Sequence, residues 1–243
     1  TALQSAENVV HTPVWVVVSG GQDSAGNQMS TERPFTYTVD TRPPGDPNGV
    51  RIEPPAINAN NQTAVDATLV NPDSLDGDET AFLSIVNTTT GDSVTVQQQI
   101  TTGGADTTFT DIDVSSLPDG TVIAEGYVRD DAGNTGGTVQ NDETPKDTTV
   151  PTINTFDATN PSGTSVEVTL DVSESLSTIT IDLADTNGTT VATLTKNNVD
   201  NTNCPTGGPC VYTWQVDTGG YSVYEATLQE AADSLNNDGA SGQ

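Results

Sequence analysis

Short runs in which apolar and polar residues alternate recur along most of the chain. The clearest run, "TVIAEGYV" at 121–128, alternates as a strand does when one of its faces packs on a core. Asn, Asp, Gly and Pro separate the runs, and these residues favour turns. The stretch "EATLQEAADSL" hints at a helix, but it holds the same place before a turn as two other predicted strands, so we expect a strand there. The pattern predicts strands at 50–57, 63–70, 80–87, 93–100, 107–114, 121–130, 136–142, 152–159, 164–173, 176–185, 190–195, 211–217 and 221–231.

One acidic loop occurs almost unchanged in two places. "DSAGN" at 23–27 and "DDAGN" at 130–134 are separated by 107 residues, and the following segments "VDTRPP" (39–44) and "KDTTVP" (146–151) keep that offset. "DSLNN" at 233–237 follows the second copy by 103 residues and stands behind a comparable apolar run. A repeat of this length has the size of a domain and is too long for a solenoid unit.

About seven short strands in each stretch of about 100 residues are typical of an immunoglobulin-like sandwich. We therefore predict an all-β protein of tandem immunoglobulin-like β-sandwiches in a row, the first one incomplete. The predicted divisions are a partial unit at 1–44, which has only the last strands, and whole domains at 45–148 and 149–243.

The repeated loop is expected to be a turn at the end of each sandwich. Gly26 and Gly133 provide the positive φ that such a turn requires, and the Asp and Asn side chains can cap it. The prolines of the following segment stiffen the passage into the next domain. The third copy has Leu235 and Asn236 where the others have Ala and Gly, which weakens the prediction of a tight turn there.

The partial unit at 1–44 contains the densest apolar stretch of the chain. Half a sandwich would leave an apolar face and unpaired strand edges in water. We expect this segment to pack against strands from a neighbouring copy or from chain outside the sequence, which would make it an assembly segment. The residues predicted to form the contact are Val14, Trp15, Val16, Val17 and Val18.

The charge narrows the classes of function. With 34 acidic and 6 basic residues the net charge is −28, which excludes binding to nucleic-acid backbones and disfavours anionic membrane surfaces. No apolar run is long enough to span a membrane. Dense carboxylates suit a protein adapted to high salt, where cations screen their repulsion. An ordinary acidic secreted protein is the alternative.

The two cysteines indicate an extracellular protein. Cys204 and Cys210 flank "PTGGP", a Pro- and Gly-rich stretch that can close a disulfide-bonded hairpin loop, although a pair of free thiols is the alternative. Asn61, Asn87 and Asn187 each begin an Asn-x-Ser/Thr triplet and are candidate glycosylation sites.

The loop followed by a strand and "VDTxxP" resembles the tandem immunoglobulin-like domains of bacterial and archaeal surface adhesins and biofilm-associated proteins. The stretch "DTTVPTINTFDATNPSG", with "SVEVTLDVSESLSTITI" after it, is similar to repeats of secreted haloarchaeal proteins. The resemblance is most extensive over 130–243. It implies a surface protein and says little about its biological role.

Calcium at the domain junctions is a further implication of this resemblance. Asp23, Asp40 and Asp46 are the candidate ligands at the first junction, and Asp130, Asp131 and Asp147 at the second. Oxygen ligands of this kind suit Ca²⁺, and in such adhesins the ion stiffens the rod. Solvated carboxylates without an ion are the alternative.

Catalytic motifs are missing from the sequence. His11 is the single histidine, and neither a "GxSxG" nucleophile nor a cysteine nucleophile accompanies it. We predict a non-enzymatic extracellular structural protein, a subunit or segment of a cell-surface rod, filament or surface layer, whose partners are copies of itself or the rest of a longer chain through strand pairing. A glycan-binding adhesin module, or the accessory domains of a secreted hydrolase, is the alternative. It would need an aromatic patch, for which Trp15, Tyr212 and Trp214 are candidates, although Tyr212 and Trp214 are first expected in the core.

Overall fold

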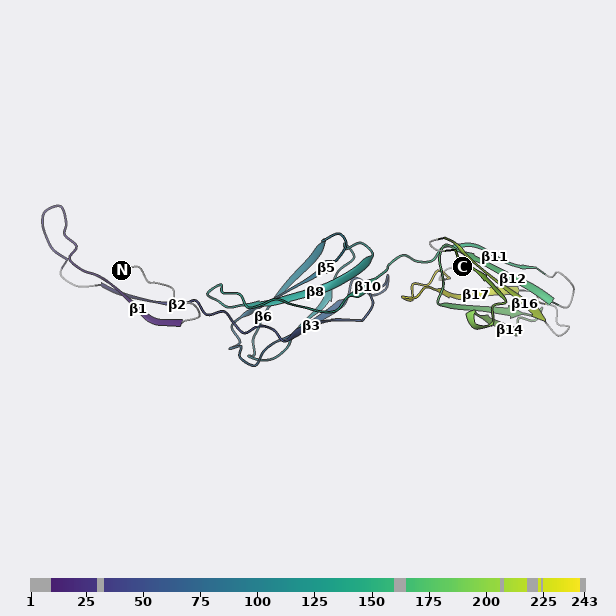
Figure 1. The fold of residues 1–243 in the computed structure, drawn as a ribbon, viewed down its shortest axis with the longest axis horizontal. Helices are drawn as coiled ribbons and strands as arrows, with labels where there is room; N and C mark the ends of the chain where they lie inside the picture. Colours follow the sequence, from purple (N-terminus) through teal and green to yellow (C-terminus); the bar gives the residue numbers. More distant parts are fainter. Residues whose placement is uncertain are drawn as a thin grey trace. The chain divides into compact units, whose positions relative to one another are not determined.

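A computed structural model gives the fold of the chain (Figure 1). It describes residues 10–29, 33–159, 165–205, 208–217, 223 and 225–240, and for most of residues 10–18 and 33–38 it describes the backbone only. The regular secondary structure of the described part consists of β-strands, apart from one short 3-10 helix at Lys196–Asn198. None of its helices has the length and apolar character that crossing a membrane would require.

The strands lie close to the positions that the alternating pattern predicts. The strand predicted at 221–231 is confirmed as β17 (Glu225–Ala232), whereas the pattern does not predict the short strands β10 (Thr144–Lys146) and β15 (Asn201–Asn203). The strands are β1 (Val10–Val18), β2 (Arg33–Asp40), β3 (Gly49–Glu53), β4 (Val65–Val70), β5 (Thr80–Asn87), β6 (Ser93–Gln99), β7 (Thr107–Ile112), β8 (Gly120–Arg129), β9 (Val139–Gln140), β10 (Thr144–Lys146), β11 (Ile153–Thr159), β12 (Ser165–Val172), β13 (Thr178–Ala184), β14 (Thr190–Thr195), β15 (Asn201–Asn203), β16 (Cys210–Asp217) and β17 (Glu225–Ala232).

These strands form antiparallel sheets that face each other in pairs, as in an immunoglobulin-like sandwich. One pair consists of β3-β4-β7 and β10-β8-β5-β6, with β9 also pairing with β8. The other consists of β11-β12-β16-β15 and β14-β13-β17. The predicted all-β, immunoglobulin-like fold is therefore confirmed. By compactness the chain divides into a first unit (Thr1–Glu53, Asp66–Leu117 and Val122–Glu143) and a second unit (Pro54–Val65, Pro118–Thr121 and Thr144–Gln243).

The core of the first unit follows the alternation in its strands. In β8 every second residue is buried, and across the sheet Leu83 of β5 lies opposite Gly126 of β8. A Cβ at Gly126 would lie 2.5 Å from the Leu69 Cδ1 atom, so a glycine is required where Leu69 packs onto this sheet. The strand predicted at 121–130 therefore packs against Leu69 because it has a glycine at this position as well as an alternating pattern.

In the second unit, the two sheets labelled by β12 and β17 in Figure 1 enclose a continuous apolar core. Tyr212 and Trp214 are fully buried in it. The Tyr212 hydroxyl accepts a hydrogen bond from the Leu176 amide at 2.9 Å, and Trp214 Nε1 donates to the Thr195 carbonyl at 3.0 Å. Their expected core role is confirmed, and neither is available as a platform for a ligand.

A disulfide bond joins Cys204 and Cys210, as predicted. Cys210 is the first residue of β16 and is buried in the core, while Cys204 follows β15. The two cysteines are 6 positions apart in the sequence, and the bond ties the end of β15 to the neighbouring strand β16. The short loop that it closes constrains the unfolded chain only modestly.

The segment β1–β2 is a two-stranded antiparallel sheet. Its pairing matches that of β8 with β9 at the 107-residue offset, because Val18 lies opposite Arg33 and Glu125 lies opposite Gln140. Of the predicted assembly residues, the structure describes only the side chain of Val17, which is 47% exposed. The side chains of Val14, Trp15, Val16 and Val18 lie outside the described ones.

One lysine of this acidic chain is buried. Lys146 in β10 is 3% exposed, and its Nζ lies 3.0 Å from an Asp119 carboxylate oxygen. Asp119 also accepts hydrogen bonds from the Thr148 amide and from the hydroxyls of Thr148 and Thr149. Burial alone would raise the pKa of Asp119, but the hydrogen bonds from Lys146 and Thr148 and the charge of Lys146 outweigh it and lower that pKa.

Replacing Asp119 is expected to destabilise the protein strongly. Asp119→Ala leaves a buried ammonium group without a counter-charge, which we expect to cost about 3 kcal/mol in urea unfolding. Because the folded-state pKa of Asp119 is lowered, this stabilisation is present above its ordinary pKa of 3.8 and disappears as the pH falls through the folded value. The double variant Asp119→Ala, Lys146→Met should recover most of the loss. A single variant as stable as the wild type would contradict the assignment.

Candidate functional site

The loop that occurs three times in the sequence has the same geometry each time. In each copy the aspartate accepts hydrogen bonds from the backbone amide and the side-chain amide of the asparagine four residues later, at 2.8 to 3.0 Å. The asparagine side-chain bond is the main reason that the pKa of Asp23 lies below its usual value. The loops close the bridges Gln22–Gln28, Arg129–Thr135 and Ala232–Asp238.

Each turn has one residue with positive φ at the same position. Gly26 and Gly133 have φ of 88° and 93°, as predicted. In the third loop Asn236 takes this position with φ of 66°, because asparagine tolerates the left-handed conformation better than most residues. The departure from the Ala-Gly pattern therefore does not prevent the turn.

The second and third loops each also bind a linker, which is the chain segment that begins at Asp40 at the end of β2 or at Asp147 after β10. Asn134 Nδ2 donates a hydrogen bond to the Asp40 carbonyl at 3.1 Å, and Asn237 Nδ2 donates to the Asp147 carbonyl at 2.9 Å. Asp40 and Asp147 stand at equivalent positions of the repeat, and each carboxylate accepts the amide of the residue two positions later. We call the Asp–Asn loop with its bound linker carbonyl a linker clasp.

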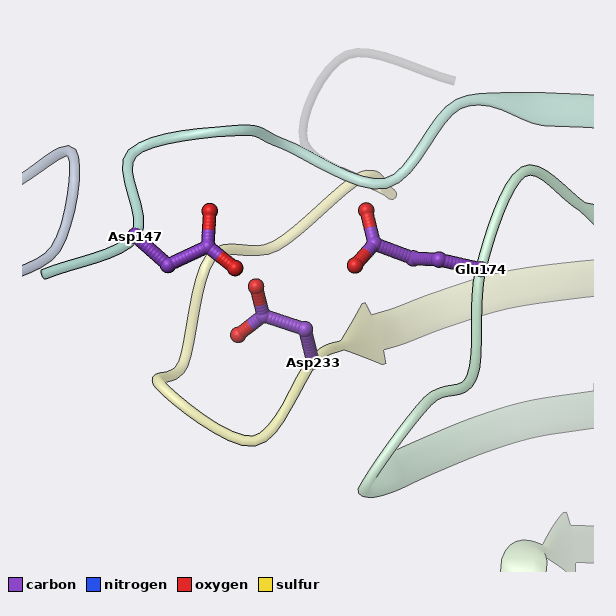
Figure 2. A group of neighbouring side chains, drawn as sticks. All are labelled: Asp147, Glu174 and Asp233. Atoms are coloured by element: carbon purple, nitrogen blue, oxygen red, sulfur yellow. The ribbon is translucent and has the colours of Figure 1, made fainter. Parts of the chain in front are cut away.

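Three carboxylates of the second unit meet beside its linker clasp (Figure 2). Asp147 lies on the linker after β10, Glu174 on the turn after β12, and Asp233 at the end of β17. One oxygen from each lies within 4.8 Å of the others, and in Figure 2 the three carboxylates point toward one another. A cavity of about 610 Å³ adjoins them and is lined by Asp147, Glu174 and the disulfide-bonded Cys204 and Cys210.

The three carboxylates differ in how their charge is balanced. Asp233 is only 3% exposed, and it accepts hydrogen bonds from the Leu235 amide and from both amides of Asn237. Burial raises the pKa of Glu174, and repulsion by Asp147 and Asp233 raises it further. A hard divalent cation such as Ca²⁺ is bound by carboxylate oxygens and would relieve this repulsion. The arrangement is therefore suited to a cation.

The group of carboxylates that the structure brings together differs from the sets predicted as calcium ligands. Asp147 lies with Glu174 and Asp233, and not in the predicted set with Asp130 and Asp131. The reason is the linker clasp, which brings each linker aspartate to the loop that follows it by about 90 residues. The cation itself stays a prediction.

In the first unit the predicted ligands are divided in the same way. Asp40 lines a hollow of about 570 Å³ with Asp130 and Asp131, whereas Asp23 is exposed and bonded within its own loop. Asp46 accepts a hydrogen bond from the Gly137 amide at 2.5 Å. The remaining acidic residues of this hollow include Glu79, whose carboxylate is already bonded to the amides of Asp76 and Gly77.

The three candidate glycosylation sites differ in access. Asn87 is fully buried and its side chain accepts hydrogen bonds from Thr89 and Thr90, so the folded unit has no room for a glycan there. Asn61 uses its side-chain nitrogen in a hydrogen bond to the Ala56 carbonyl. Asn187 lies exposed on the turn between β13 and β14. Occupancy stays a prediction, and the structure favours Asn187.

Comparison with known proteins gives overlaps of low similarity. No known protein family matches the chain, and neither does any curated protein. A tetra-tandem repeat in the extending region of a large adhesion protein overlaps 88% of the chain at 17% identity and a TM-score of 0.37. The chain spans about half (52%) of that structure.

Two further solved structures overlap the chain at a comparable level. The FN1-FN3 domains of chicken CNTN1 cover 85% of the chain, which spans 68% of them, at 14% identity and a TM-score of 0.35. A 1.5-MDa bacterial ice-binding adhesin covers 80%, and the chain spans 62% of that structure, at 18% identity and a TM-score of 0.37. The fold assignment therefore rests on the strand order of the chain itself.

Sequence reasoning missed two of the three clustered carboxylates. The position of Asp233 could have been found, because it stands 103 residues after Asp130 in the third copy of the loop. Glu174 carries no comparable signal. It lies in a turn that reaches the cluster only after β12 and β13 have paired with their neighbours.

Removing the Glu174 charge is expected to stabilise the second unit when no cation is present. Because its pKa is raised in the folded unit, stability should fall as the pH rises above its ordinary pKa of 4.5. Glu174→Gln should therefore increase the unfolding temperature at pH 7 in chelator, on the order of 1–3 °C, and flatten the pH profile. Glu143→Gln, an exposed change of equal charge in the first unit, is the control. Identical profiles for the two variants would remove the repulsion argument.

Proposed function

We propose that the chain is a non-enzymatic extracellular structural protein, a segment of a cell-surface rod, filament or surface layer built from tandem immunoglobulin-like units. The observation that carries this proposal is the linker clasp, which occurs at Asp40–Asn134 and again at Asp147–Asn237. A protein whose repeated motif fixes its own linkers is suited to transmit force along the chain.

The clasp restricts the linker in two ways. The asparagine side chain donates a hydrogen bond to the carbonyl of the linker aspartate. The carboxylate of the same aspartate accepts a hydrogen bond from the backbone amide two residues later, at Arg42 or Thr149. Pro43, Pro44 and Pro151 fix φ in the residues that follow. Few free torsions remain between a clasp and the next strand, so bending of the linker is costly.

Two features, a disulfide bond and an exposed glycosylation triplet, support a location outside the cell, and the net charge agrees with a halophilic source. The disulfide bond between Cys204 and Cys210 persists in oxidising surroundings. The net charge of −28 keeps a surface hydrated where salt is concentrated, which agrees with a halophilic source. Asn187 is exposed and open to a glycan.

We also propose that a calcium ion binds at Asp147, Glu174 and Asp233. The three carboxylates come from the linker and from two turns of the second unit, so an ion shared by them would tie the linker to that unit. The pKa of Glu174 is raised by burial and then by repulsion from Asp147 and Asp233, and a bound cation would offset that repulsion, which supports the site.

The alternative of a glycan-binding module receives less support. Such sites usually place aromatic rings on an open surface. Tyr212 and Trp214 are buried, and the side chain of Trp15 lies outside the described ones.

Loss of the clasp should free the linkers and leave the sandwiches folded. Asn134→Ala and Asn237→Ala each remove the bond to a linker carbonyl, so the amides of Arg42 and Thr149, respectively, should exchange hydrogen on the order of tenfold faster. Asn27→Ala is the matched control, because its loop has the same internal bonds and holds no linker carbonyl among the described residues. Exchange at Arg42 and Thr149 that does not change in the variants would refute the proposed role.

The two expected cation effects can be separated by calorimetry. Added NaCl should raise the unfolding temperature of the whole chain steadily up to molar concentration, because it screens 34 acidic groups. Millimolar CaCl₂ at fixed ionic strength should raise only the transition of the second unit, and Glu174→Gln should abolish that rise. An unfolding temperature that does not change with NaCl would contradict adaptation to high salt. Equal responses to calcium in the variant and the wild type would contradict the proposed calcium site.

A further inference from the structure

The first of the three Asp–Asn loops has the geometry of a clasp, but no linker is bound to it among the residues that the structure describes. Asn27 Nδ2 donates to Asp23 at 2.8 Å, as its counterparts do to their own aspartates. Asn134 and Asn237 use the second hydrogen of the amide to hold a linker carbonyl. Among the described residues, nothing accepts the corresponding hydrogen of Asn27.

The Oδ1 atom of Asn134 in the first unit also lacks, among the described residues, the donor that the equivalent atom of Asn237 has in the second unit. In the second unit the Oδ1 atom of Asn237 accepts the Ala59 amide at 2.9 Å, and the Asn58 side chain donates to the Leu235 carbonyl at 2.7 Å. The segment Pro54–Val65 therefore lies on the Asp–Asn loop of that unit. Asn134 Oδ1 has the equivalent position in the first unit and receives no donor from the described part of the chain.

One edge of β1 also has no neighbouring strand in the described chain. β8 pairs with β5 along one edge, from Asn87–Val122 to Thr80–Arg129, and with β9 along the other. β1 stands at the β8 position of the repeat and pairs with β2 as β8 pairs with β9. In the described chain no strand takes the β5 position beside β1.

We propose that strands on the N-terminal side of β1 in the same polypeptide combine with β1 and β2 to complete an immunoglobulin-like unit at this end of the first unit. One of these strands pairs antiparallel with the open edge of β1, the linker that enters the completed unit places a carbonyl on Asn27 Nδ2, and a segment of the Pro54–Val65 type places a main-chain N–H on Asn134 Oδ1. Three separate gaps are filled by one body of the kind that the chain already contains twice.

A second copy of the chain is a poorer source for this body. In such a copy Asn58 and Ala59 are already bonded to the loop at 233–237, and β5 already lies between β6 and β8. Supplying them would require a folded sandwich to open. The proposal therefore commits to strands on the N-terminal side of β1 in the same polypeptide.

An extended chain tests the proposal directly. Residues 1–9 are replaced by a copy of residues 39–116 fused to the N-terminal side of Val10, which continues the 107-residue offset and supplies the equivalents of β3 to β7. We expect alternate amides of β1 to exchange hydrogen more slowly than in the original chain, on the order of tenfold. Added residues that stay unprotected, beside a β1 that exchanges as before, would overturn the proposal.

Asn27→Ala provides the matched control. In the original chain it removes only the bond to Asp23, whereas in the extended chain it also removes the bond to the new linker carbonyl. The exchange of that linker should therefore accelerate on substitution by about the factor expected at Arg42 in Asn134→Ala. If the substitution leaves exchange of the new linker unchanged, the role of Asn27 is wrong.

A second probe does not depend on the fit of side chains in the extended chain. A peptide with the sequence of residues 79–87, which includes β5, is added to the original chain, with a Leu83→Pro peptide as the control. Slower exchange at alternate β1 amides with the first peptide alone supports an open edge, and no protection opposes it. Protection that grows with the concentration of the chain itself would instead identify a second copy as the partner. The inference rests on the proposed tandem role, but failure of these probes alone would leave the clasp at Asn134 and Asn237 intact.

Discussion

The hydrogen bonds between an aspartate and the asparagine four residues later set the geometry of all three copies of the repeated loop. They close the turn internally, with both carboxylate oxygens in use, and so leave the second amide hydrogen of asparagine directed outward. That hydrogen holds the linker carbonyl at Asp40 and at Asp147. The turn therefore reverses the chain and also fixes the path of the linker.

The excess of acidic residues constrains how such a protein can be stabilised. With only 6 basic side chains, few carboxylates can have a cationic neighbour. Most of those with lowered pKa values, such as Asp23, Asp113 and Asp185, are held by amide and hydroxyl hydrogen bonds from their own turns. Lys146 and Asp119 are the exception, since a buried ammonium group requires a counter-charge. Glu174 is the opposite case, because burial and its two acidic neighbours raise its pKa and no donor among the described residues offsets them.

Much of the fold could be predicted because it depends on local patterns. Alternation places β4 to β8 and β11 to β14 within a few residues of their observed bounds, and Gly26 and Gly133 mark the turns. The short strands β10 and β15 were not predicted, because each forms only where a longer neighbour offers an edge. The burial of Asn87 was missed for a related reason, since its triplet looks like any exposed sequon until the turn at 87–92 folds inward.

The sequence by itself determined the all-β class, the repeat and its offset, the disulfide and the turns at Gly26 and Gly133, because each depends on residues close together in the chain or on spacing alone. Only the tertiary structure decided which aspartates meet. Asp147 joins Asp233 across 86 residues, and Glu174 joins both, because the paired sheets bring the linker and two turns to one end of the second unit. Carboxylates are so frequent in this chain that composition could not distinguish these three from the others. The distances that strand pairing sets do distinguish them, because electrostatic repulsion becomes significant only between groups that the fold holds a few ångströms apart.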